Sequence, residues 1–147
     1  MLKTILAISG KPGLYRLISR GRGNLIVETL DKEKKRMPVF GNNKVVSLAD
    51  ISVYSDKGDV PLKQVLTNIQ KKENGQLISF NPKKASRAEL EKYFAEILTD
   101  YDRERVHVSD IKKLIGWYNT LVSEGITAFD EALKPTEGNN IDNRQDK

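Results

Sequence analysis

The apolar pattern of the chain changes near residue 58, and this change limits the fold more than any other feature. Before it, short runs of apolar and β-branched residues are separated by turns that contain glycine, about every eight to twelve residues. After it, apolar residues recur at helical spacing, as in Leu62, Val65, Leu66 and Ile69. We therefore expect an α+β fold in two parts, a β-rich module over residues 1–58 and a helical domain over residues 59–133.

The first part contains five β-like runs. They are Thr4–Ile8, Leu14–Ser19, Asn24–Leu30, Met37–Phe40 and Lys44–Ser55, the last interrupted around Ala49 and Asp50. Closing such short strands into a barrel removes the exposed edges that an open sheet would leave. We predict a small SH3-like β-barrel, with an OB-like barrel as the second choice, and we expect the β-like run over residues 76–80 to return to it as a strand.

The second part contains three helical stripes with recognisable ends. Asp59 is a plausible N-cap for the first helix and Gly75 a stop signal. The second helix begins at Ser86 and Glu89, which have the spacing of a capping box. The third follows Ser109. Short amphipathic helices bury their apolar faces by crossing one another, so we predict a three-helix bundle.

The remaining stretch, residues 134–147, contains a single apolar side chain, Ile141. It cannot bury enough apolar surface to offset the entropy cost of ordering, so we predict a disordered tail.

The positive charge of the chain lies in its first part. Residues 1–58 carry eleven Lys/Arg and five Asp/Glu, whereas the remainder is nearly neutral, with fourteen and fifteen. Many of these cations lie in or beside the predicted turns, where they would displace counterions from nucleic-acid phosphates. Tyr15, Phe40 and Tyr54 are candidate stacking rings, although aromatic residues also fill cores.

We therefore expect a non-enzymatic binding module that contacts nucleic acid through the basic turns, RNA being favoured over DNA because a small barrel offers stacking surfaces rather than a groove-reading helix. The candidate contact residues are Lys11, Arg16, Arg20, Arg22, Lys34, Lys35 and Arg36. The alternative is a protein–protein interaction adaptor, in which the cations supply solubility or steering. An exposed apolar patch around Trp117 or Phe129 would favour that alternative.

No pattern in the sequence predicts a catalytic residue, a metal site or a cofactor. The chain has no cysteine, which excludes disulfides and thiolate chemistry. His107 is the one histidine, and the acidic run around Asp102 departs from a calcium loop at Arg105, where glycine is needed. The N-terminal apolar run is too short for a signal peptide or a membrane span, so we expect a cytoplasmic protein without membrane contact.

Three segments resemble a family of small bacterial proteins, chiefly from Bacteroidetes, known as a domain of unknown function. They are Ile8-Ser9-Gly10-Lys11-Pro12-Gly13-Leu14-Tyr15, Ser47-Leu48-Ala49-Asp50-Ile51, and Ser109-Asp110-Ile111-Lys112-Lys113-Leu114-Ile115 followed by Trp117-Tyr118-Asn119. The resemblance covers about residues 1–130. It implies an SH3-like barrel followed by a small helical domain, and it implies no activity, cofactor or catalytic residue.

Overall fold

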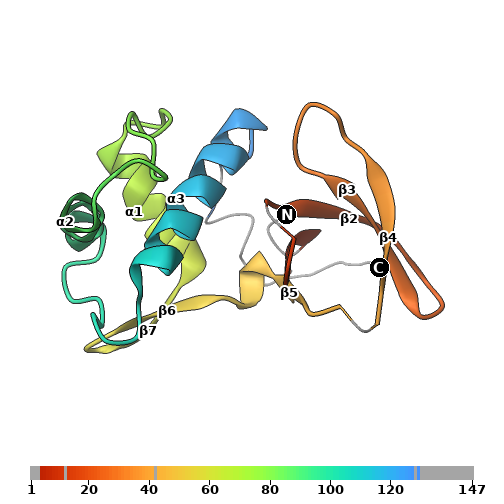
Figure 1. Cartoon of the computed structure of the whole chain (residues 1–147), viewed down its shortest axis with the longest axis horizontal. Coiled ribbons are helices and arrows are strands. Elements are labelled where there is room, and N and C mark those ends of the chain that lie inside the picture. The colour runs from red at the N-terminus through yellow and green to blue at the C-terminus, as the bar shows by residue number, and fades with distance from the viewer. Residues whose placement is uncertain (1–3, 12, 42, 128, 130–147) are drawn as a thin grey trace.

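The structure, a computed structural model, describes residues 4–11, 13–41, 43–127 and 129. Figure 1 shows the three helices on one side of the molecule and the β2–β3–β4 hairpins on the other. The elements are β1 (Ile5–Ile8), β2 (Tyr15–Gly21), β3 (Asn24–Thr29), β4 (Arg36–Phe40), β5 (Val45–Ser47), the 3-10 helix η2 (Leu48–Asp50), β6 (Ser52–Ser55), β7 (Gly58–Pro61), α1 (Leu62–Lys72), α2 (Arg87–Ile97) and α3 (Val108–Ser123). The fold is therefore mixed α+β, as predicted.

The first five strands form one antiparallel sheet in the order β4-β3-β2-β1-β5. This sheet is open, and the prediction of a closed SH3-like barrel is not confirmed. Among the described residues β5 pairs only with β1, and β4 only with β3, so both strands are edges. Pro38 in β4 suits this position because proline has no N–H to donate to a further strand.

The two faces of the sheet belong to two different clusters of buried side chains. On β1, Leu6 and Ile8 join one small cluster with Val27 and Val39, whereas Ile5 joins the main core. This division follows from the alternation of side chains along a strand. The main core also contains Leu48 of η2 and the apolar stripes of all three helices. The sheet and the helices therefore share one core.

The helical half departs from the predictions in three places. Asp59 is not an N-cap, because residues 58–61 pair with residues 52–55 as the β6–β7 hairpin and α1 begins at Leu62. Residues 76–80 form no strand, since the main-chain N–H of Ile78 donates to the Asn119 side chain instead. A three-helix bundle is not confirmed, because β6 and η2 contact α1 within the same core.

The capping box at Ser86 is confirmed. The Ser86 hydroxyl accepts a hydrogen bond from the N–H of Glu89 (3.1 Å), and the Ser86 N–H donates to the Glu89 carboxylate (2.9 Å). The predicted tail, residues 134–147, lies outside the described residues, and the boundary at residue 58 stays a prediction. Within the described part of the chain, no helix is long and apolar enough to cross a membrane.

Candidate functional site

The seven candidate cations do not lie together. The register pairs Tyr15 with Thr29 at one end of the β2–β3 hairpin and Gly21 with Asn24 at the other. These rows are about 17 Å apart by the rise of an antiparallel strand. Arg20 and Arg22 lie at the second end, and Lys34 and the residues after it at the first, so the two hairpin loops point in opposite directions in Figure 1.

The loop between β3 and β4 is held by hydrogen bonds to Asp31. One carboxylate oxygen accepts from the Thr29 hydroxyl (2.8 Å) and from the N–H groups of Glu33 and Lys34 (both 3.0 Å). These bonds, first of all the one from Thr29, lower the pKa of Asp31. Lys34 takes a left-handed conformation, with φ of 50°. The loop is thus a turn fixed by hydrogen bonds to Asp31, and its lysines are exposed to solvent.

Two of the predicted cations in this region already have acidic partners. The Lys35 ammonium lies 3.0 Å from the Glu33 carboxylate, and Arg36 lies 3.3 Å from Glu28. Arg16 stands in the same cross-strand row as Glu28 and Arg36. These carboxylates reduce the positive potential that the loop can present to an anion.

Lys11 lies in a different setting, a groove between the sheet and α3. Its larger cavity has a volume of about 630 Å³ and is lined by β1, the turn after it, β5 and α3. Lys11, Lys44 and Lys113 line it, and no carboxylate does among the described residues. Val46 of β5, 44% exposed, and the partly buried Trp117 of α3 form its apolar surface.

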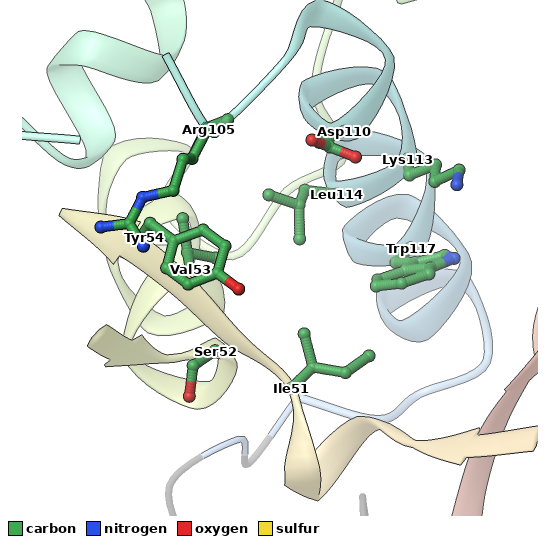
Figure 2. A pocket seen from close by; sticks show the side chains of 10 residues that line it. Ile51, Ser52, Val53, Tyr54, Arg105, Asp110, Lys113, Leu114 and Trp117 are labelled. Carbon is green, nitrogen blue, oxygen red and sulfur yellow. The ribbon is translucent and has the colours of Figure 1, made fainter. Parts of the chain in front are cut away.

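A smaller cavity of about 190 Å³ adjoins the larger one. The two share Ile51, Lys113 and Trp117, and we call them together the sheet–α3 groove. Figure 2 shows Tyr54 and Trp117 on opposite sides of the small cavity. In the same view Asp110 lies at its upper rim and Lys113 points away from Tyr54.

Arg105 lines the small cavity and is held there by two contacts. Its Nε lies 2.9 Å from the Asp102 carboxylate, and its guanidinium lies 4.3 Å from the centre of the Tyr54 ring. The hydrogen bond with Arg105 lowers the pKa of Asp102 and raises that of Arg105. A guanidinium fixed over an aromatic face is a cation–π arrangement that keeps the charge beside the cavity.

The aromatic residues singled out in the sequence differ in their exposure and in their distance from the groove. Tyr15 is buried in the small cluster under the sheet, so it is not a stacking surface. Phe40 is 55% exposed but lies on β4, away from the groove, and Tyr54 is 41% exposed and lines it. Phe129 is buried against Tyr118.

The sequence interpretation missed the contribution of α3. It considered Trp117 for an apolar patch that would favour a protein partner, mentioned Arg105 only as a departure from a calcium loop, and left Lys113 out of the candidate list. The bulky pair Trp117-Tyr118 was the available signal: Tyr118 is fully buried, whereas Trp117 lines the groove.

His107 is exposed and precedes α3, and its main-chain N–H donates to the Asp110 carboxylate (3.0 Å). Among the described residues, no group of three or more His, Cys, Asp or Glu side chains is placed to hold a metal ion.

The chain is an α+β protein in which an open antiparallel sheet packs with three helices, and a basic groove runs between the sheet and α3. Two family models match the chain, both described as domains of unknown function: DUF5606 over residues 2–48 and DUF6852 over residues 51–121. The chain is also similar to a protein from Bacteroides vulgatus, solved by solution NMR as a structural genomics target. The identity is 62%, the match covers 88% of this chain and 91% of that one, and the TM-score is 0.74. The chain belongs to the family of that protein. No curated protein matches it significantly.

Proposed function

We propose that the protein binds single-stranded nucleic acid, RNA in preference to DNA, in the sheet–α3 groove. The observation that carries the proposal is the composition of the groove. The described residues that line its two cavities include four cations and only one carboxylate. The cations are Lys11, Lys44, Lys113 and Arg105, and the carboxylate is Asp110.

Single-stranded nucleic acid needs both of the features that the groove combines. Phosphates are neutralised by lysine and arginine along a channel, and unpaired bases stack on aromatic rings. Lys11 follows β1, Lys44 precedes β5, Lys113 lies on α3, and Trp117 lines both cavities. The strand's backbone would follow the cations while its bases contact Trp117 and Tyr54.

The preference for RNA rests on hydroxyl groups beside the groove. Ser9 lines the large cavity and Ser52 the small one, and both are exposed. A serine hydroxyl can donate to or accept from a ribose 2′-hydroxyl, the group that distinguishes RNA from DNA.

The test is fluorescence polarisation with labelled mixed-sequence RNA, single-stranded DNA and duplex DNA at 50 and 200 mM salt. We expect micromolar or tighter binding of RNA that weakens with salt. The triple variant Lys11→Gln/Lys44→Gln/Lys113→Gln should weaken it about tenfold or more and reduce the magnitude of the salt slope by about 2. The matched control, Lys71→Gln/Lys83→Gln/Lys84→Gln, removes the same charge from exposed lysines outside the groove and should have little effect.

A second variant separates the groove from the basic turns. Replacing Arg20, Arg22, Lys34, Lys35 and Arg36 together removes more charge than the groove variant does, but Lys35 and Arg36 are already paired. We expect the smaller loss from this variant. A larger loss here, with the groove variant unaffected, would move the interface to the turns.

The alternative function is a protein–protein interaction adaptor, and one observation favours it. Phe40 is 55% exposed and Ile18 36% exposed, and with Pro38 they lie on the sheet outside both clusters of buried residues. Exposed apolar side chains on a sheet mark a protein contact where they adjoin one another. If none of the nucleic acids binds at either salt concentration, this face becomes the surface to map.

A further inference from the structure

The small cavity of the groove differs from the large one in holding a carboxylate. We propose that it is a base pocket that prefers guanine, an inference that rests on the proposed binding of single-stranded RNA. The large cavity can attract phosphate but offers no charged acceptor among its described lining residues. Asp110 gives the small cavity an acceptor that can distinguish one base from another.

The size and surface of the small cavity suit one base. Its volume is about 190 Å³, and cavities of about 150 Å³ admit a benzene ring. Val53 and Leu114, both buried, supply apolar surface, and the Tyr54 and Trp117 rings stand on either side. Arg105 also lines the pocket and its guanidinium lies against the Tyr54 ring, so this cation is placed to meet a phosphate beside a bound base.

Asp110 retains hydrogen-bonding capacity toward the cavity. One of its oxygens, Oδ2, accepts the N–H of His107, but an ionised carboxylate has two oxygens and about four acceptor sites. Its partner in the pocket must therefore be a hydrogen-bond donor, and the donors that the bases carry are N–H groups. Lys113 lies one turn further along α3 and lines the same cavity, but no ion pair joins the two side chains in the described structure.

The hydrogen-bond donors that each base carries then predict how tightly it binds the Asp110 carboxylate. Guanine carries two adjacent donors, the N1–H and the 2-amino group, and can bind a carboxylate through both. Adenine and cytosine each offer one exocyclic amino group. Uracil offers one ring N–H between two carbonyl oxygens, which a carboxylate repels. We expect guanine to bind best and uracil worst.

The experiment compares oligouridine probes that differ only at one central position, which holds uracil, guanine, adenine, cytosine or hypoxanthine. A single guanine avoids the self-association of guanine-rich strands. We expect central guanine to bind about fivefold or more tightly than uracil in fluorescence polarisation. Hypoxanthine, which lacks the 2-amino group, should lose most of this gain and so provides a test that needs no variant.

The variant Asp110→Asn tests the same contact from the protein side. Asparagine keeps an oxygen that can accept the His107 N–H, so α3 should stay capped, and thermal melting checks this. The preference for guanine should disappear while oligouridine binding changes little.

The outcomes separate the two proposals. Equal binding of all five probes, or a guanine preference that survives in Asp110→Asn, would overturn the base pocket and leave the proposed function standing. If no probe binds, and no mixed-sequence RNA either, both proposals fail.

Discussion

Tyr118 joins α3 to the segment between α1 and α2. Its side chain is fully buried, and its hydroxyl donates to the main-chain oxygen of Gln76 (2.7 Å). Replacing it by phenylalanine keeps the ring but removes the donor, so we expect Tyr118→Phe to lower the free energy of unfolding by about 1 kcal/mol. Urea unfolding measures this. Tyr54→Phe is the control, because Tyr54 is 41% exposed, and a loss as large in the control would contradict the assignment.

At the scale of residues, the sequence shows which side chains are cationic but not which of them lie close together. Lys11 was a candidate from the start, and it lines the groove. Lys44 and Lys113 were visible as cations, but nothing local indicates that residues about 70 positions apart line one cavity. Only the packing of α3 beside β1 and β5 brings them together, and packing of this kind has no signature in a single sequence.

At the scale of elements, the capping box at the start of α2 makes the stability of the fold depend on pH. The hydrogen bonds from Ser86 lower the pKa of Glu89 below its ordinary value of about 4.5. A carboxyl whose pKa is lower in the folded state stabilises the fold at pH values above that ordinary value. The contribution is lost as the pH falls through the lowered pKa. We therefore expect Glu89→Gln to reduce stability at neutral pH and to match the natural protein at strongly acidic pH.

Thermal unfolding across pH 2–7 measures this difference, with Glu104→Gln as the matched control. Glu104 is also an exposed glutamate, but it lies outside the helices. A difference between Glu89→Gln and the natural protein that stayed constant down to the lowest pH would show that the charge of Glu89 is not responsible. The hydroxyl can be tested separately, because Ser86→Ala should cost about 1 kcal/mol at neutral pH.

The elements themselves were largely predictable, since periodicity and glycine turns are local signals. The five strands of the main sheet and the helix stripes follow the predicted runs closely. The β6–β7 hairpin was missed because Gly58-Asp59-Val60-Pro61 has the composition of a helix start. Its pairing with Ser52–Ser55 outweighs that local preference.

At the scale of the whole molecule, the closed barrel is the main difference between prediction and structure. Strand patterns do not show whether the edge strands pair, and here β4 and β5 stay apart among the described residues. Parts as small as these bury too little surface to be stable alone, and in the structure one core spans both. The sequence does not show which residues make this contact: they include Ile5 of β1, with Leu14 just before β2 and Leu30 just after β3.

The shared core leads to a prediction about unfolding. Leu48 is fully buried, and η2, which holds it, contacts both β1 and α1. We expect Leu48→Ala to lower the free energy of unfolding by about 2–5 kcal/mol, because it leaves a cavity where the sheet meets the helices. Val46→Ala is the control, since Val46 lies two residues away and is 44% exposed, and it should cost less than about 0.5 kcal/mol.

The same variant tests whether the molecule unfolds as one unit. Trp117 is the one tryptophan and lies beside the sheet, so its fluorescence reports the junction, whereas far-ultraviolet circular dichroism reports all strands and helices. With one shared core, the two signals should have the same urea midpoint in the natural protein, and they should again coincide, at a lower midpoint, in Leu48→Ala. Fluorescence that changed first, while the circular dichroism persisted, would mean that the sheet and the helices separate before either unfolds. The groove, which both parts line, would then open independently of the rest of the fold.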